Sequence, residues 1–304
     1  MIRRILNKLE SIYYYRYFSK VENGANTTLL KKIYKSTDIL FIEKVFQLDF
    51  FREIVEPQIL EISDQKEILV LAPHQDDELI GLGGTLLKFK KNKKNITLVF
   101  LTDGASLSNP EEKKVRFIEA KKVAHELNAT LIEINIPNDT MKINENHLND
   151  LISVFKMRKW DEVFSIWPID NPPKHRICSF FVGKALEKIN DKDFQINLYS
   201  VHTELIPNYY SDISSLIVEK QNLIAVYQSQ LKQQAYDHLA LSRDAWSSRF
   251  LPVSRDKRYI ELFFKVNQKE YLRLMNVYKN VNCKELFKGH QDCIDIFNSY
   301  LNQK

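Results

Sequence analysis

Strand-like and helix-like segments alternate over residues 66–200, and this alternation most constrains the fold of the chain. Longer amphipathic stretches such as "EEKKVRFIEAKKVAHELN" (111–128) separate short apolar runs, each about as long as one buried strand. Strands that alternate with helices predict a parallel sheet with helices on both faces. We therefore expect an α/β fold, a Rossmann-like and mostly parallel sheet flanked by helices. Its first strands are "EILVLAP" (67–73), "ITLVFLT" (96–102), "ATLIEINI" (129–136) and "DEVFSIWP" (161–168).

The segments on either side of this core have a different pattern. Residues 1–65 read as helices with short breaks and predict a helical N-terminal extension. Two further strands are expected at "INLYSVHTEL" (196–205) and "RYIELFFKV" (258–266), and a helical tail is expected at 269–304. The expected organisation is thus a helical extension (1–65), one α/β domain (66–268) and a helical C-terminal tail (269–304).

Charge and hydropathy exclude several classes of protein. The 44 basic residues are balanced by 39 acidic ones, so the net charge of +5 does not indicate a nucleic-acid-binding protein. No apolar run approaches the roughly 20 residues that span a bilayer. The first 20 residues are basic but lack the apolar core of a signal peptide, so we expect a cytoplasmic protein. The same basic and aromatic segment either makes peripheral contact with an anionic membrane or packs its tyrosines onto the core.

The three cysteines do not form a disulfide framework. Their number is odd and their spacing irregular, which favours reduced thiols. Cys283, His290 and Cys293 have the spacing C-x6-H-x2-C, which matches no common zinc module, so helix packing is the favoured interpretation. The remaining cysteine is Cys178.

Four polar loops follow the four predicted strands. In an open parallel sheet, ligands bind beyond the carboxyl ends of the strands. The turn "HQDDE" (74–78) follows the first strand, and "TDGAS" (102–106), "PNDT" (137–140) and "WPIDNPPKH" (167–175) follow the next three. Loops rich in Asp, Asn and His therefore meet at one edge of the sheet, which predicts a functional site there.

The carboxylates of the first loop need a counter-charge. His74 and Asp77 are three residues apart, and a His nitrogen and a carboxylate at this separation can bind one ion at zinc bond lengths of about 2.0–2.2 Å. A cation would also relieve the repulsion between Asp76 and Asp77 and keep both ionised. Asp76 would then be free to act as a base, and His175 lies at the right edge of the sheet to be a third ligand. The alternative is that His74 and the acids only cap the following helix.

A nucleotide-binding enzyme is a weaker alternative. The "GLGG" segment (81–84) resembles a dinucleotide fingerprint, but acids occupy the turn where its first glycine belongs. Leu86 stands where the third glycine belongs, so the glycine spacing argues against this class.

The stretch "APHQDDELIGLGGTL" (72–86) resembles the P-H-P-D-D-E-x-x-G-x-G-G motif of the PIG-L-like (LmbE-like) zinc N-deacetylases. Members of this family remove acetyl groups from N-acetylglucosamine-type sugars. The resemblance continues through "VFLTDG" (99–104), the R-x-x-E-A helix at 115–130 and "EKQNLIAVYQSQ" (219–230), and so covers about residues 66–265.

The resemblance implies a zinc hydrolase acting on an N-acetylated amino sugar. By position, Zn²⁺ would be held by His74, Asp77 and His175, with Asp76 as the general base that accepts a proton from water. Sugar contacts would come from Arg116 and Asp139. The sequence specifies neither the carrier of the sugar nor the oligomeric state.

The chain departs from the family pattern beside the third ligand. The family's H-P-D-H segment is Pro172, Pro173, Lys174 and His175 here, so the histidine that helps to polarise the carbonyl and protonate the amine is missing. Either Lys174 or His202, on the next predicted strand, is a candidate replacement, and we favour His202. Gln75 replaces a proline and Ala105 replaces an acid.

These departures keep a second function open. An enzyme that lost its acid could persist as a catalytically weakened sugar-binding protein on a deacetylase fold. Turnover and a variant of His74 would distinguish the two classes.

Overall fold

The computed structural model describes residues 57–61, 67–105, 109, 111–189 and 195–275. Their centre is an eight-stranded sheet with the strand order β1-β7-β8-β6-β5-β2-β3-β4. The central strands β2, β3, β4, β5 and β6 run parallel, whereas β8 runs antiparallel to β6 and to β7. The expected α/β, mostly parallel sheet flanked by helices is confirmed. The strands are β1 (Gln58–Ile59), β2 (Glu67–Ala72), β3 (Asn95–Thr102), β4 (Ala129–Ile136), β5 (Glu162–Ile166), β6 (Gln195–Tyr199), β7 (Tyr209–Asp212) and β8 (Ile260–Asn267).

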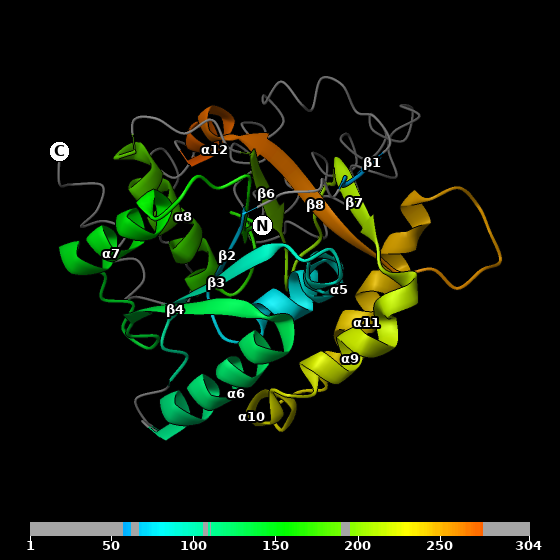
Figure 1. Ribbon diagram of the computed structural model, residues 1–304, viewed down its shortest axis with the longest axis horizontal. Coiled ribbons are helices and arrows are strands. Elements are labelled where there is room, and N and C mark those ends of the chain that lie inside the picture. The colour runs from blue at the N-terminus through cyan, green and yellow to red at the C-terminus, as the bar shows by residue number, and fades with distance from the viewer. Residues whose placement is uncertain (1–56, 62–66, 106–108, 110, 190–194, 276–304) are drawn as a thin grey trace, which may run out of the picture.

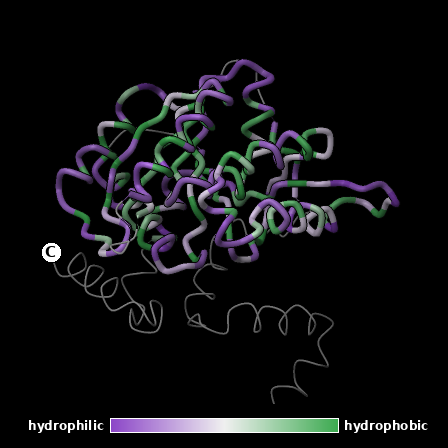
Figure 2. Tube along the Cα trace, turned by 90° about the horizontal axis from the view of Figure 1, so that it is seen from below, coloured by the Kyte–Doolittle hydropathy of each residue, from purple (hydrophilic) through white to green (hydrophobic). Residues whose placement is uncertain are grey.

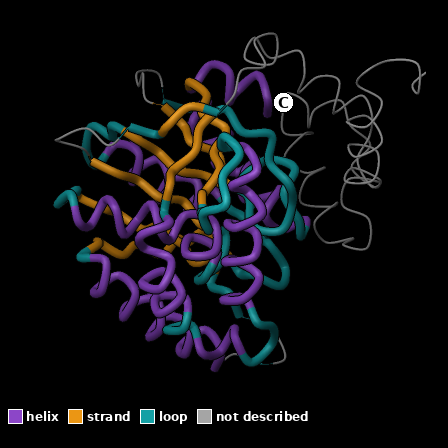
Figure 3. The backbone as a smooth tube through the Cα atoms, turned by 90° about the vertical axis from the view of Figure 1, so that its right-hand side faces the viewer, coloured by secondary structure: helices purple, strands orange, loops and turns teal. Residues whose placement is uncertain are grey.

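Helices cover the sheet on both sides (Figure 1, Figure 3). Three helices, α7 (Glu145–Lys156), α8 (Pro173–Glu187) and α12 (Gln268–Met275), pack together on one side. The other side carries α5 (Asp77–Lys91), α6 (Glu111–Leu127), α9 (Ile217–Ile224), α10 (Gln228–Leu231) and α11 (Tyr236–Ser247), with short 3-10 turns at Ser214–Leu216 and Ser248–Phe250. Among the described helices, none is both long and apolar enough to cross a bilayer.

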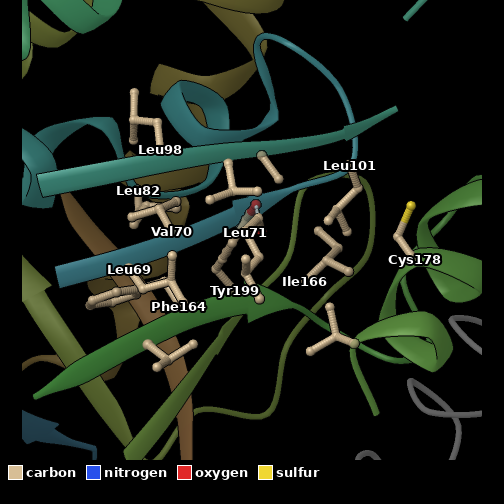
Figure 4. Close-up of a cluster of buried hydrophobic side chains, with 14 of the residues drawn as sticks. Leu69, Val70, Leu71, Leu82, Leu98, Leu101, Phe164, Ile166, Cys178 and Tyr199 are labelled. Carbon is tan, nitrogen blue, oxygen red and sulfur yellow. Dashed lines mark hydrogen bonds between the residues drawn. The ribbon is translucent and has the colours of Figure 1, made fainter. Parts of the chain in front are cut away.

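The core lies where β2, β5 and β6 run side by side (Figure 4). Five of the six residues of β2 are buried, as expected for a strand covered on both faces. Tyr199 of β6 is fully buried among these strands, and its hydroxyl donates to the carbonyl of Leu71 (3.0 Å), so its polar atom is satisfied. Hydrophobic segments concentrate inside the molecule and hydrophilic loops lie outside (Figure 2).

The strand order reverses between β2 and β5. From β2 the chain continues outward to β3 and β4, then returns to place β5 and β6 on the other side of β2. Such a switch point opens a crevice at the carboxyl ends of its two strands. The loops after β2 and after β5 therefore meet. The first carries His74, and the second leads into α8, whose first turn carries His175.

One expected strand is shorter than predicted. The strand expected at 196–205 ends at Tyr199, and His202 lies in the loop beyond it rather than on the strand. The N–H groups of Val201, His202 and Thr203 donate to the Asp170 carboxylate (2.9–3.1 Å) instead of to a neighbouring strand. The Asp170 carboxylate thus takes the backbone hydrogen bonds that a longer β6 would have made with a neighbouring strand.

The predicted boundaries at 66 and 268 stay predictions. Strand β1 pairs with β7 in the same sheet although it precedes residue 66. Helix α12 packs on α8, with the Tyr271 hydroxyl donating to the Ser179 carbonyl (2.9 Å). The suggested membrane-contacting N-terminus and the Cys283–Cys293 cluster lie outside the described residues. Cys178 is buried and forms no disulfide within the described part of the chain.

Candidate metal centre

The turn after β2 has an unusual backbone. Asp76 has a φ of 132°, in the region that favours glycine, and such backbone strain tends to be retained at functional sites. The Asp76 N–H donates to the Glu78 carboxylate (3.0 Å), and the Tyr227 hydroxyl donates to the other Glu78 oxygen (2.7 Å). The fully buried Glu78 therefore holds the turn in this conformation.

His74, Asp77 and His175 bring three ligand atoms together. His74 Nδ1 lies 3.1 Å from Asp77 Oδ2 and 3.2 Å from His175 Nε2, which is 3.2 Å from the same Asp77 oxygen. A zinc ion with bonds of about 2.0–2.1 Å in tetrahedral geometry has ligands roughly 3.3 Å apart. The triangle fits a divalent cation with little adjustment, and among the described residues these are the ones grouped with metal-binding geometry.

The other nitrogen of each histidine is also engaged. His175 Nδ1 lies 2.9 Å from the Asp170 carboxylate, and His74 Nε2 lies 2.9 Å from the Asn138 side-chain oxygen. With a hydrogen on each of these outer nitrogens, the inner nitrogens present lone pairs to an ion. A carboxylate or carbonyl behind a ligating histidine is the common arrangement that fixes the ring and its tautomer.

Electrostatics within the triad are strongly coupled. Burial acts to raise the pKa of Asp77, but the neighbouring His175 and His74 outweigh it and hold this pKa well below its usual value. Burial acts to lower the pKa of His175, yet Asp77 and Asp170 raise it to about 10. In the ion-free form a proton on His175 therefore supplies the positive charge that the carboxylates require. A bound cation would take over this role.

Asp76 is held in a different environment from Asp77. It is buried and its side chain does not cap α5. Burial and the neighbouring Asp77 raise its pKa well above the usual value, against the opposing effect of Arg116. The two adjacent carboxylates are therefore chemically distinct, one suited to hold a cation and the other to exchange a proton.

The remaining predicted residues surround this centre at different depths. The His202 ring is exposed, with its centroid 5.5 Å from that of His175. Lys174 Nζ lies 3.8 Å from Asp139 Oδ1, so this pair joins the loop after β4 to the start of α8. Arg116 is buried on α6, where it donates to the Gln230 side chain (2.6 Å).

Two atoms beside the centre are polar, buried and unpartnered among the described residues. They are Arg116 Nε and Gln75 Oε1. Both side chains pack against Gly104, which has a φ of 66°. A Cβ at this position would lie 2.4 Å from Gln75 Oε1 and 2.7 Å from Arg116 Cδ. Only glycine fits at this position.

Asp170 and Asn138 belong to the site, although no sequence pattern singles them out. Asp170 has no exposed surface and accepts from the Thr203 hydroxyl (2.8 Å) as well as from backbone N–H groups and His175. Both residues lie in loops that the sequence had marked as polar. A signal was present for Asp170, because a metal-binding histidine usually has a carboxylate partner and Asp170 is the acid in its own loop.

Comparisons with known proteins match the part of the chain that carries this centre. Residues 69–186 match the PIG-L family, described as GlcNAc-PI de-N-acetylase. A diacetylchitobiose deacetylase of Thermococcus kodakarensis is 26% identical over 229 residues, which are 67% of this chain and 82% of that protein. The match to the family includes all three residues of the triad.

Solved structures share the fold. An N,N'-diacetylchitobiose deacetylase from Pyrococcus horikoshii superposes with a TM-score of 0.58 at 22% identity, covering 83% of this chain and 95% of that one. A 4-carboxy-2-hydroxymuconate hydratase from Pseudomonas putida gives a TM-score of 0.53 at 18% identity, with 67% and 96% covered. Because a hydratase shares the fold, the reaction must be argued from the side chains.

Proposed function

Because residues 69–186 form a PIG-L family domain, we propose that the protein is a zinc-dependent N-deacetylase acting on an N-acetylated amino sugar. The observation that carries the proposal is the triad of His74, Asp77 and His175, whose ligand atoms lie 3.1–3.2 Å apart. Two imidazoles and a carboxylate suit zinc, although the same donor set also holds non-haem iron in other proteins. The identity of the metal is therefore part of the proposal.

A zinc ion held by the triad would supply Lewis acidity, which polarises an acetamide carbonyl and lowers the pKa of water to about 7. The protein residues perform the remaining tasks. Asp170 and Asn138 fix the two imidazole rings so that their inner nitrogens converge. Preorganised ligands of this kind need no rearrangement when charge develops during the reaction.

Asp76 is the proposed general base. It lies next to the ligand Asp77 but is not part of the triad. Burial and the neighbouring Asp77 raise its pKa above the usual value, which makes its carboxylate a stronger base toward water. The proton must later reach the departing amine, either from Asp76 itself or from a second acid.

His202 is the proposed second acid. Pro172 stands where the family has a histidine, and the ring centroid of the exposed residue His202 lies 5.5 Å from that of His175. Lys174 is the second choice, because its ammonium group is already paired with Asp139.

Sugar contacts are proposed for Arg116, Asp139 and Lys174. Arg116 brings a permanent charge and an unpartnered Nε, and the ion pair of Lys174 with Asp139 offers both donors and acceptors to hydroxyl groups. These side chains come from α6, the loop after β4 and α8.

The test is metal analysis followed by an acetate-release assay. Protein produced with zinc supplied should contain close to one zinc ion per chain, and it should release acetate from at least one member of a panel of free, nucleotide-linked and oligomeric N-acetylhexosamines. A His74→Ala variant is the control and should lose both zinc and turnover. Wild-type protein without bound metal would contradict the proposal.

A sugar-binding protein remains the second candidate, and Pro172 favours it because this residue has no donor. If wild-type protein binds zinc and sugar but releases no acetate, and if His74→Ala binds sugar as well as wild type does, the binding function is correct.

A further inference from the structure

Helix α5, which begins at the ligand Asp77, is broken near its start. Leu82 has φ −147° and ψ 24°, so the helical backbone is interrupted after its first turn. A break of this kind leaves the carbonyls before it and the N–H groups after it without partners in the helix. Each of these groups must be satisfied from elsewhere, because this part of α5 is buried.

Charged side chains from distant segments satisfy them. The Glu261 carboxylate of β8 accepts from the N–H groups of Gly84 (2.8 Å) and Thr85 (2.7 Å), as a capping residue would. On the other side of the break, Lys220 donates to the Ile80 carbonyl (3.2 Å) and also to Glu261 (2.7 Å). Negative charge at a helix start and positive charge at a helix end both suit the helix dipole.

Arg243 of α11 donates hydrogen bonds both to α5 at the same break and to the loop after β6. Its Nη2 donates to the Ile80 carbonyl and, more weakly, to that of Gly81 (3.4 Å). Its Nη1 donates to the carbonyls of Ser200 (2.7 Å) and Val201 (3.4 Å) in the loop after β6. One guanidinium group therefore joins the first turn of α5 to that loop.

Each of the two joined segments positions one side of the metal triad. The first turn of α5 carries Asp77, three residues before Ile80. The loop after β6 donates three N–H groups to Asp170, and Asp170 in turn engages His175 Nδ1 (2.9 Å). Arg243 is thus connected to Asp77 through one turn of α5. It is connected to His175 through the loop after β6 and the Asp170 carboxylate that this loop binds.

We propose that Arg243 is a positioning residue that sets the distance between Asp77 and His175, and thereby the geometry of the metal centre. The inference rests on the proposed function for the identity of the centre. Arg243 has no contact with the triad and acts through the backbone carbonyls it holds. A planar guanidinium suits this role because its two outer nitrogens donate in fixed, diverging directions, which a lysine cannot reproduce.

The test compares Arg243→Gln and Arg243→Lys with a matched control, Arg249→Gln. Arg249 belongs to the same part of the chain and is also partly exposed, but it donates to the Trp246 carbonyl and to the Glu204 side chain, further along the loop after β6. No hydrogen bond links it to α5 or to the Ser200 and Val201 carbonyls that Arg243 holds. Three readouts are needed: zinc affinity by competition with a chromogenic chelator, the visible spectrum of the Co²⁺-loaded protein, and separate kcat and KM values. Circular dichroism at the working temperature confirms that each variant is folded.

Loss of a residue that orients metal ligands typically weakens metal affinity or activity about 10–100-fold. We expect Arg243→Gln to bind zinc about tenfold more weakly, to change the Co²⁺ spectrum and to lower kcat more than it raises KM. Arg243→Lys should fall between this variant and wild type, and Arg249→Gln should match wild type. If the glutamine variant does not fold, the lysine variant alone decides by the same three readouts.

Three outcomes would overturn the inference. They are a wild-type Co²⁺ spectrum and zinc affinity in folded Arg243→Gln, equal losses in Arg249→Gln, and a lysine variant indistinguishable from wild type. Failure of the proposed function looks different, because wild-type protein would then bind no metal. If wild type binds metal but releases no acetate, the spectrum and the affinity still decide the role of Arg243.

Discussion

Asp76 and Asp77 are adjacent in the chain, yet the fold gives them opposite properties. Two histidines hold the pKa of Asp77 well below its usual value despite its burial, whereas burial and Asp77 itself raise the pKa of Asp76. The glycine-like φ of Asp76 accompanies this separation of roles. The roles can be tested by removing one charge at a time while keeping the shape of the side chain.

Asp76→Asn is expected to retain zinc and to lose about 10²–10⁴-fold in kcat, which is the usual contribution of a general base. Asp77→Asn is the matched control and should lose zinc, because an amide oxygen is a far weaker ligand than a carboxylate. Metal content by mass spectrometry and kcat on the same samples provide the measurement. The reverse pattern of metal loss would exchange the two assigned roles.

His202→Ala is expected to lower kcat about 10²–10³-fold with zinc retained, which is the usual effect of removing one donor to the developing charge. Lys174→Ala should have a smaller effect on kcat and a larger one on KM, since Lys174 is paired with Asp139 at the edge of the site. A His202→Ala enzyme with full kcat and full zinc content would remove His202 from the mechanism.

At the scale of single elements, the "GLGG" segment of α5 is a packing device. A Cβ added at Gly81 would lie 2.2 Å from the nearest atom of the Tyr199 ring, so the glycine lets α5 lie close to β6. The glycines thus have a structural cause that requires no nucleotide.

Gly84→Ala should lower the free energy of unfolding and Gly83→Ala should raise it, although the two residues are adjacent. A Cβ at Gly84 would lie 2.6–2.8 Å from Ile213 side-chain atoms, and overpacking of this kind costs about 1–3 kcal/mol. A Cβ at Gly83 meets its nearest atom, Lys220 Cγ, at 3.4 Å, so this variant should gain up to about 1 kcal/mol from the better helix propensity of alanine. Urea unfolding measures the free energy of unfolding of each variant, from the midpoint and the slope m of its transition. Equal midpoints for the two variants would mean that α5 can shift away from Ile213 at no cost.

At the scale of the whole molecule, the sequence predicted the strands, helices and loops that follow from a periodic pattern. It did not predict partners that meet only when distant segments fold together. The alternation of apolar runs and amphipathic stretches predicted the parallel strands β2 to β6, and the loops after them predicted where His74 and His175 would meet. The end of β6 was predicted too late, because its apolar pattern continues past Tyr199 while Asp170 takes the backbone N–H groups. Partners such as Asp170 and Arg243 could not be assigned, since their roles arise from contacts between segments far apart in the sequence.

Removing the metal should lower the stability of the whole fold, because the triad joins α5 to α8 across the switch point of the sheet. A ligand present at 1,000 times its Kd stabilises the folded state by about 4.1 kcal/mol. Since about 1 kcal/mol shifts the Tm of a domain of 150–250 residues by about 2–4 °C, chelation should lower Tm by roughly 8–16 °C. The measurement is a thermal scan of one sample with zinc, with a chelator, and with zinc added back. His74→Ala is the control and should show one Tm under all three conditions. A wild-type Tm that does not respond to chelation would mean that the triad holds no structural cation.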